Sequence, residues 1–301
     1  MHDRPREHEH GSTPVVTVIV PALDAARTIL PQLCALTGQV GAPPFEVLVA
    51  DNGSTDGTQA VVQGVARADS RVRLLDATAN RGTNGARNLG ARAARGSLLL
   101  YCDADDVVDI GWVREMSSAL QTNDLVGGRI DEHVLNPGVA ARCRATQMEE
   151  LPRTDFAALQ YAVGCCVGIR RHVLDAVGGW DLTYPADICG DDIELSWRCQ
   201  LAGYNLGFAP RALVYRRLRS SLRGAAGQSY RYGWSLPMIY SRFRHIAFGS
   251  RAARALLADS LWTVGTIPRA IVSGQFRRHW LQRSAFLAGR AIGCARLRVL
   301  A

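Results

Sequence analysis

The sequence predicts an α/β protein with a mostly parallel, doubly wound sheet, followed by a basic helical extension. Three observations support this prediction: strands and helices alternate along the first part of the chain, three strands end in aspartate or turn residues, and the charge changes sign near residue 211. Alternating strands and helices are typical of parallel sheets with helices on both faces. With 301 residues, 48% of them hydrophobic, the chain can bury one large core or two modest ones.

The first segments show the alternation most clearly. Residues 15–20 form an uninterrupted, mostly β-branched run, which predicts a strand buried on both faces. A helix is expected at 25–36, a second strand at 45–50 and a second helix at 58–68. This βαβα order predicts a parallel sheet.

The same pattern continues beyond residue 70. Further strands are expected at 73–75, 97–102, 125–130 and 163–169, and further helices at 85–94, 154–161, 171–177 and 193–202. Ligands bind at the carboxyl ends of parallel strands. We therefore expect 21–24, 51–54 and 103–106, which follow three of the strands, to line one crevice.

The last third of the chain differs in charge. Residues 1–210 carry 18 Arg against 26 acidic residues, whereas 211–301 carry 17 Arg against the single acid Asp259. Such a basic segment predicts a phosphate-bearing partner, either an anionic membrane surface or a nucleic acid. No zinc finger, homeodomain or RRM-like motif accompanies it, so we expect no nucleic-acid partner.

Apolar side chains recur at roughly helical spacing among these arginines: Leu256, Leu257, Leu261, Val264, Phe276, Trp280 and Leu287. Basic amphipathic helices can lie in a membrane interface, although such a stripe can also pack on its own protein. No apolar run reaches the roughly 18 to 20 residues that a spanning helix needs.

The other compositional features point to the cytoplasm. Residues 1–11 are polar and are expected to form a disordered tail without the apolar region of a signal peptide. The eight Cys include no C-x-x-C pair, so no zinc site is expected. We predict a cytoplasmic protein, with a peripheral position on the inner face of the membrane as the variant.

The turn at Asp103-Ala104-Asp105 is the most specific chemical feature. Carboxylates at positions i and i+2 can converge on one hard divalent cation, and Mn²⁺ or Mg²⁺ combines well with one or two carboxylates and phosphate oxygens. Such a cation would neutralise a leaving diphosphate. The alternative is a solvated acidic turn.

Several motifs occur in a fixed order: V-T-V-I-V-P-A, L-V-A-D-N-G-S-T-D-G-T, N-R-G-T-N-G-A-R-N and L-L-L-Y-C-D-A-D-D, followed by G-G-W-D and by G-D-D with L-S-W-R. This series resembles the family 2 glycosyltransferases over roughly residues 15–217. The resemblance implies a GT-A domain at 12–217 and a basic amphipathic helical extension at 218–301. It also implies an inverting, metal-dependent enzyme that moves a sugar from a nucleotide-diphosphate donor to an acceptor hydroxyl.

The resemblance further implies a donor site formed by Pro21, Ala22, Asp24, Asp51, Asn52, Arg87, Asp103 and Ala104. In this site Asp51 would hydrogen-bond the base, and Arg87 would lie near the nucleotide and diphosphate. Asp103 would meet the ribose, and Asp105, with Asp103, would meet the metal. As alternatives, Asp51 could belong only to an Asx-rich turn, and Arg87 could be a surface helix residue.

A second acidic pair, Asp191 and Asp192, precedes the helix expected at 193–202. These residues could serve only as N-caps. By resemblance they correspond to an E-D motif, which makes Asp192 the catalytic base and Asp191 a supporting residue, with the reverse assignment open. Gly179, Trp180 and Asp181 are the expected acceptor-binding residues.

Three segments depart from the family pattern. Arg216 stands where relatives carry a His that approaches the metal, so either water fills that place or Arg216 contacts the diphosphate. Residues 164–168, Gly-Cys-Cys-Val-Gly, replace an Asn-containing strand, and this leaves the acceptor pocket open. Residues 228–232 resemble a Q-x-x-R-W element only weakly and are expected to form an ordinary helix.

The expected pathway class is cell-envelope, polysaccharide or natural-product glycosylation, with a glycan, a lipid-linked molecule or a small molecule as acceptor. Two other functions remain open: a catalytically inactive nucleotide-sugar-binding subunit and a sugar-1-phosphate nucleotidyltransferase. The latter class usually has a Gly-rich loop with a Lys, and all 35 basic residues of this chain are Arg.

Overall fold

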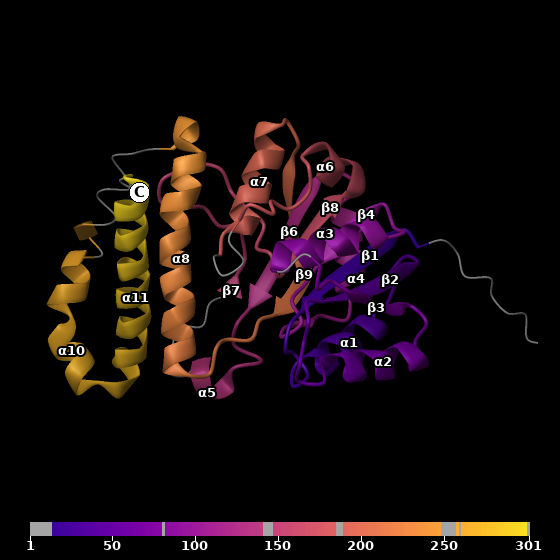
Figure 1. Ribbon diagram of the computed structural model, residues 1–301, viewed down its shortest axis with the longest axis horizontal. Helices are drawn as coiled ribbons and strands as arrows, with labels where there is room; N and C mark the ends of the chain where they lie inside the picture. Colours follow the sequence, from indigo (N-terminus) through magenta and orange to yellow (C-terminus); the bar gives the residue numbers. More distant parts are fainter. Residues whose placement is uncertain are drawn as a thin grey trace, which may run out of the picture.

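The computed structural model describes residues 14–79, 82–140, 147–184, 189–247, 257–258 and 260–299. The expected tail at 1–11 and the acid Asp259 lie outside these residues. The described part is an α/β domain built on one curled mixed sheet, with long helices gathered at one end (Figure 1).

Half of the sheet is parallel, as the sequence predicts. It contains, in spatial order, β3 (Val72–Asp76), β2 (Phe45–Asp51), β1 (Val16–Ala22) and β4 (Leu98–Tyr101). The helices between these strands are α1 (Ile29–Thr37), α2 (Thr58–Ala68) and α3 (Thr83–Ala93). All side chains of β2 and β4 are buried, which explains why their sequences are mostly apolar.

Beyond β4 the sheet is mixed. β8 (Val167–Arg170) runs antiparallel to β4 and to β6 (Leu125–Asp131), and β9 (Leu206–Tyr215) runs parallel to β6. Two short strands, β5 (Val107–Val108) and β7 (Gln147–Met148), pair antiparallel with β9 and β6. No described residue between β7 and β8 is helical, and β8 enters from the opposite end of the sheet.

The helix expected at 154–161 is therefore wrong. The segment consists of turns with an isolated bridge between Arg153 and Gln160. Its apolar residues Phe156 and Ala157 are buried in a cluster with Trp197 and Ile239. Their spacing reflects burial of an irregular segment rather than a helical face.

The other helices of the α/β domain are α4 (Trp112–Ala119), the short α5 (Pro137–Ala140), α6 (Arg171–Ala176) and α7 (Asp191–Leu201). α7 begins two residues earlier than the sequence predicts, because Gly190 adopts a left-handed conformation (φ 97°) at the N-cap position. The early start brings Asp191 and Asp192 into the first helical turn.

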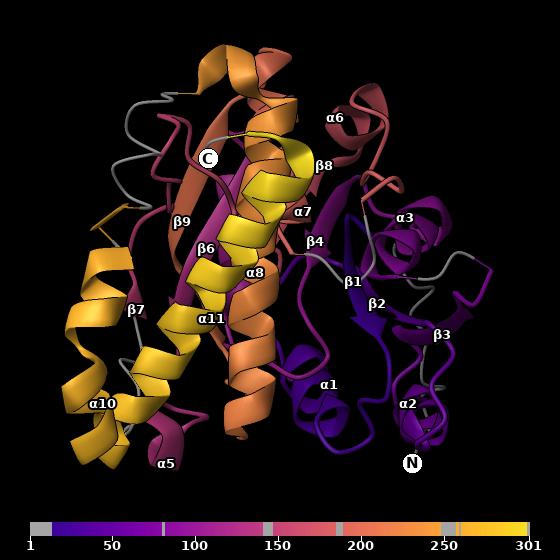
Figure 2. The ribbon, with the colours of Figure 1, turned by 60° about the vertical axis from the view of Figure 1, so that its left-hand side comes forward.

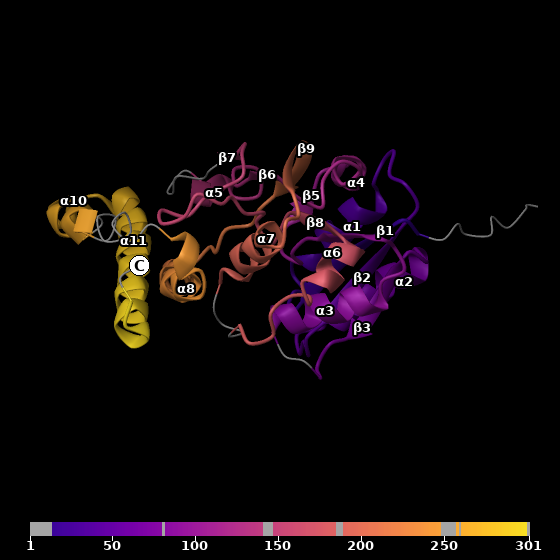
Figure 3. The same ribbon diagram turned by 90° about the horizontal axis from the view of Figure 1, so that it is seen from above.

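The C-terminal helices are α8 (Leu222–Arg242), the 3-10 turn η1 (Arg244–Ile246), α10 (Ile267–Val272) and α11 (Gly274–Leu297). Viewed from above, α8 lies next to the sheet domain, α11 lies beyond it, and α10 is outermost (Figure 3). A Cβ atom at Gly233 would lie only 1.8 Å from the Phe286 carbonyl oxygen, so the close contact between α8 and α11 requires glycine there. Among the described residues, no helix is both long and apolar enough to cross a bilayer.

Candidate active site

The loop after β2 is closed by Asp51, which is 2% exposed. Its carboxylate accepts hydrogen bonds from the backbone N–H and hydroxyl of Ser54, and from Gln59 Nε2 at 2.7 Å. Asp51 thus belongs to a turn, and its side chain is also held by α2. A carboxylate oxygen has a second lone pair, so these contacts leave Asp51 able to accept another hydrogen bond.

The other residues expected to hold a nucleotide lie at the same edge of the sheet. Pro21 and Ala22 end β1, and Ala22 pairs in register with Asp51. Asp24 has a positive φ of 48°, and its Oδ1 accepts a hydrogen bond from the Thr55 N–H at 2.8 Å. Asn52 donates to the Ala77 carbonyl at 3.1 Å. These contacts join the loops that follow β1, β2 and β3.

Arg87 lies at the centre of the site and is not a surface residue. Its side chain is 5% exposed, with Nη1 2.5 Å from Asp191 Oδ2 and Nη2 3.6 Å from Asp103 Oδ1. The guanidinium carbon lies 4.2 Å from the centre of the Trp180 ring, a cation–π contact. A single residue of α3 therefore connects the end of β4 with the first turn of α7.

Gly164 gives Arg87 and Asp192 a common neighbour. Its N–H donates to Asp192 Oδ2 at 3.0 Å, and its carbonyl accepts from Arg87 Nη2 at 3.5 Å. A Cβ atom at this position would lie 2.8 Å from Arg87 Nη2, so a larger residue would displace the guanidinium. Sequence reasoning did not assign Gly164 to the site. The available signal was a glycine inside the strand predicted at 163–169, which often marks a close approach of another group.

Asp192 has the electrostatics of a general base. Its second oxygen accepts from the Ile193 N–H at 2.9 Å. Burial, together with the negative charge of Asp191, raises the pKa of Asp192 to about 6. The carboxylate is still ionised at neutral pH, yet it is more basic than an exposed aspartate and can accept a proton.

Three carboxylates crowd the turn after β4. Asp106 is 2% exposed, and its Oδ1 accepts a hydrogen bond from the Arg217 N–H at 2.8 Å. Burial and the charge of Asp103 raise the pKa values of both Asp105 and Asp106. Sequence reasoning did not assign Asp106, although it directly follows the D-x-D pair.

This carboxylate cluster fits a divalent cation. Ligand atoms of Asp103, Asp106 and Cys165 lie within 4.8 Å of one another. Burial raises the pKa of the Cys165 thiol well above its usual value, so the thiol is protonated at neutral pH and the carboxylates supply the oxygen ligands. A hard divalent cation such as Mg²⁺ or Mn²⁺ prefers oxygen ligands and would relieve the mutual repulsion of these acids.

Two arginines after β9 have partners that the sequence did not predict. Arg219 Nη1 lies 3.5 Å from Asp105 Oδ2. Arg216 instead donates to the Tyr232 hydroxyl at 2.7 Å and lies 3.5 Å from Glu132 Oε1. Residues 228–232 are part of α8, as expected, and Tyr232 brings that helix to the edge of the site.

The residues expected to bind the acceptor lie between α3, α7 and α8. Trp180 is 1% exposed and packs edge to face on Tyr101, with ring centroids 5.2 Å apart. Asp181 forms an ion pair with Arg242 of α8. The Gly179 carbonyl accepts from Arg198 Nη2 at 2.8 Å.

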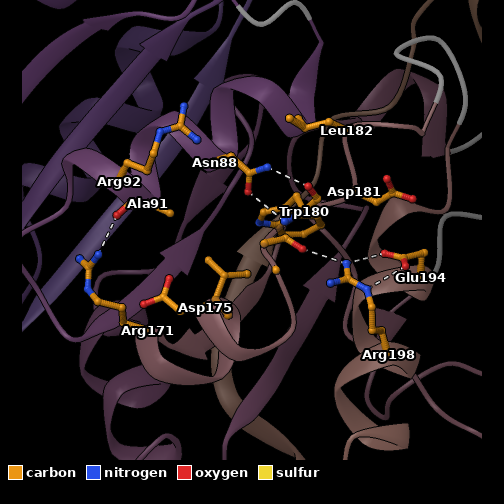
Figure 4. Close-up of a pocket in the computed structure, with 13 residues that line it drawn as sticks. Asn88, Ala91, Arg92, Arg171, Asp175, Trp180, Asp181, Leu182, Glu194 and Arg198 are labelled. Carbon is orange, nitrogen blue, oxygen red and sulfur yellow. Dashed lines mark hydrogen bonds and ion pairs between the residues drawn. The ribbon is translucent and has the colours of Figure 1, made fainter.

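A cavity of about 820 Å³ lies beside these three residues (Figure 4). Asn88 and Arg198 are held at its wall, with Asn88 Nδ2 donating to the Trp180 carbonyl at 2.7 Å and Arg198 paired with Glu194. The lining includes neither the carboxylates after β4 nor Asp192, so the cavity is a neighbour of the site rather than its centre.

The fold and this arrangement of residues agree with a known family. A sequence model described as glycosyl transferase family 2 matches residues 17–178, and a second, described as glycosyl transferase family group 2, matches residues 98–288. The chain belongs to the family 2 glycosyltransferases.

Two curated relatives illustrate the range of the family. Glycosyltransferase AglE from Haloferax volcanii is 30% identical over 203 residues, which cover 66% of this chain and 66% of AglE. The pre-mycofactocin glycosyltransferase from Mycobacterium tuberculosis is 26% identical over 271 residues, covering 87% of this chain and 55% of that protein. The chain thus spans less than two thirds of the length of these relatives.

Two solved structures share the fold. The mannosyltransferase PcManGT from Pyrobaculum calidifontis, in complex with GDP-Man and Mn²⁺, has a TM-score of 0.61 and 20% identity, covering 94% of this chain and 87% of its own. S. aureus TarS in complex with UDP has a TM-score of 0.51 and 14% identity, covering 93% and 91%. The chain has the GT-A fold of these glycosyltransferases.

Proposed function

We propose that the protein is an inverting, metal-dependent glycosyltransferase that moves a sugar from a nucleoside diphosphate to an acceptor hydroxyl. The observation that carries the proposal is the position of Asp192. Its carboxylate has a pKa of about 6 and is held by two backbone N–H groups, one of them from Gly164, which also contacts Arg87. Arg87 in turn contacts Asp103.

In this proposal Asp192 accepts the proton of the acceptor hydroxyl as its oxygen attacks the anomeric carbon. The nucleoside diphosphate leaves from the opposite face of the sugar, so the anomeric centre inverts in one displacement. Asp191 supports the base through its charge, which contributes to the raised pKa of Asp192. Arg87 holds Asp191 in place from the donor side.

The donor would lie along the loops that follow β1, β2 and β4. Asp51 would accept a hydrogen bond from the base, with Pro21, Ala22, Asp24 and Asn52 beside the nucleotide. Asp103 and Ala104 would border the ribose and diphosphate, close to the cationic Arg87. PcManGT with GDP-Man and TarS with UDP support the binding of a nucleotide-linked donor.

The residues proposed to hold Mn²⁺ or Mg²⁺ are Asp105 and Asp103, with Asp106 as a third carboxylate in the same turn. When bound, such a cation would offset the charge that develops on the leaving diphosphate. The presence of Mn²⁺ in the PcManGT complex supports this assignment. Arg219, which pairs with Asp105, would supply a further cation beside the diphosphate.

The acceptor is proposed to be a glycan, a lipid-linked molecule or a small molecule, bound near Gly179, Trp180 and Asp181. The buried Trp180 ring lies against the guanidinium of Arg87, and its main chain is held by Asn88, so this segment is fixed relative to Arg87, which contacts Asp191 beside the proposed base. The experiment that identifies the acceptor is a transfer assay with a labelled donor against candidates from these three classes.

A thermal-shift panel tests the donor site first. The protein is heated with UDP, GDP or dTDP, each with and without Mn²⁺, since a ligand that binds only the folded state raises the melting temperature. We expect one nucleotide to give a metal-dependent rise. Asp105→Ala should abolish that dependence, whereas Glu150→Gln, which removes an exposed carboxylate elsewhere, should preserve it. No shift with any nucleotide would contradict the proposal.

A further inference from the structure

The helical segment 257–272 exposes large aliphatic side chains along one stripe. Leu257, Leu261, Val264 and Ile271 follow spacings of four, three and seven residues and are 62%, 66%, 68% and 68% exposed. Ile267 and Val272, which lie in α10 with Ile271, are 41% and 86% exposed. We call these six residues the aliphatic stripe. The spacings of Leu257, Leu261 and Val264 place these side chains on one face of the helical residues before Thr266. Ile267 and Ile271 lie one turn apart on α10, which begins after the turn at Thr266.

The opposite face of the same segment packs on α11. The rings of Trp262 and Phe276 lie 5.9 Å apart, and Trp280 Nε1 donates to the Thr263 carbonyl at 3.0 Å. Ala270 is 6% exposed. Phe276 and Trp280, which the sequence places in the same apolar series as Leu257, Leu261 and Val264, therefore contact their own protein, and the aliphatic stripe is the face turned outward.

Arginine side chains border the stripe. Arg277 donates to the carbonyls of Ala270 and Ile271 at 3.2 and 3.0 Å, which places its guanidinium at the C-terminal end of α10. Arg269 is exposed and lies over the Phe276 ring at 4.6 Å. An apolar stripe beside cations is complementary to an anionic lipid surface, which offers acyl chains beneath negatively charged headgroups.

Charge also argues against a second copy of this chain as the partner. Residues 211–301 contain 17 Arg and one acid, so two such surfaces would repel each other. In the described part of the chain no helix is both long and apolar enough to span a bilayer. In the proposed mode the segment would lie in the plane of the interface.

The stripe is connected to the candidate active site through α11. Arg278 is 6% exposed and donates to the carbonyls of Arg219 and Ser220, and the Arg219 side chain pairs with Asp105. Figures 1 and 2 both show α10 at the same end of the molecule as α5 and the start of α8. A surface bound by the stripe would therefore have a defined position relative to the carboxylates of the site.

We propose that the aliphatic stripe docks the protein on an anionic bilayer, with Leu261 and Ile271 entering the interface and Arg269 and Arg277 contacting headgroups. Binding of this kind does not depend on the proposed transfer reaction and can be measured without donor or acceptor. The probes are vesicles of phosphatidylcholine alone and of phosphatidylcholine mixed with phosphatidylglycerol.

Co-sedimentation with these vesicles tests the proposal. The variant Leu261→Glu/Ile271→Glu places two acids in the stripe. Ile110→Glu/Val134→Glu is the matched control, because these residues are each 60% exposed and lie outside the stripe. All four positions are exposed, and equal melting temperatures of the two variants would verify that both are folded.

We expect the wild type and the control to bind the phosphatidylglycerol vesicles, and the stripe variant to bind at least about tenfold more weakly. Binding should be weak on phosphatidylcholine alone and should fall as salt is added. Equal binding by both variants, or equal binding to both vesicle types, would overturn the proposal. Analytical ultracentrifugation without vesicles gives a further test. If the wild type and the control were dimers and the stripe variant were a monomer, the partner of the stripe would be a second copy of the chain and the proposal would be overturned.

Discussion

The carboxyl edge of the sheet buries a charged side chain, whereas the outer face of the helical extension exposes large aliphatic side chains. Both arrangements are the reverse of what is usual in a folded protein. At the sheet edge, the guanidinium of Arg87 is buried among carboxylates. At the extension, Leu261 and Ile271 are about two-thirds exposed. Burying a charge or exposing large aliphatic groups costs stability, and in our two proposals each of these surfaces contacts another molecule.

The two regions differ in how strongly the rest of the fold determines them. The buried Arg87, on α3, has acidic partners on α7 and at the end of β4, and removing either acid leaves part of its charge uncompensated. The aliphatic stripe has packing partners on only one side. We therefore expect substitutions at the sheet edge to affect both folding and chemistry, whereas substitutions in the stripe should affect surface binding alone.

The largest effect should come from Asp192→Asn, which removes the proposed base but keeps its shape. Transfer should fall by about 10² to 10⁴, while nucleotide binding remains, because general-base help contributes about that factor. Steady-state transfer rates and thermal shifts measure the two quantities. Glu150→Gln is the control. An active Asp192→Asn would assign the base to Asp191.

The wild-type pH profile sharpens the same assignment. Since the pKa of Asp192 is raised to about 6, the fraction of ionised base should fall as the pH drops through that value. We expect the transfer rate to decline below about pH 6 by up to tenfold per pH unit. A rate that stays constant down to pH 5 would argue against Asp192.

Arg87→Met tests the buried charge directly. It leaves Asp103 and Asp191 without their shared cation, and we expect a loss of about 3 kcal/mol or more in the free energy of unfolding. Urea denaturation measures this loss. Arg92→Met, an exposed position on the same helix, should change stability by less than about 0.5 kcal/mol. Equal effects would mean that the charge network is unimportant.

Tyr232→Phe tests the link between the two regions. It removes the hydrogen bond to Arg216, and a bond to a charged group contributes about 1.5 to 3 kcal/mol. We expect the free energy of unfolding in urea to fall within that range. Tyr230→Phe, also on α8, is the control. If both variants match the wild type, α8 is not held to the sheet domain through Arg216.

The smallest effect should come from Arg242→Ala. Its ion pair with Asp181 is partly exposed, with side-chain exposures of 31% and 19%, and such pairs contribute about 0.2 to 1 kcal/mol. The loss of stability should shrink as salt is added, because screening already weakens the pair in the wild type. A loss that does not vary with salt would mean that Arg242 acts mainly through packing.

Sequence patterns predicted the first half of the sheet well and the second half less well. β1, β2 and β4 are nearly continuous apolar runs, and burial on both faces leaves few other structures for them. The residues near 154–161 were misassigned because local periodicity does not separate a helix from an irregular segment that is buried by distant residues. The expected domain boundary at 217 also stays a prediction. Ile239 of α8 and Trp197 of α7 lie in one buried cluster, so the residues on the two sides of this boundary pack together.

By itself, the sequence determined the family, the parallel half of the sheet and the chemical types at the strand ends, because each of these depends on residues that are close together in the chain. Only the tertiary structure decided that Arg87 is buried between two carboxylates, that Gly164 lies beside it, and that Arg219 rather than Arg216 pairs with Asp105. It also decided which apolar residues of the extension face outward. These features depend on contacts between segments far apart in the chain, and the spacing of residues within one segment carries no record of them.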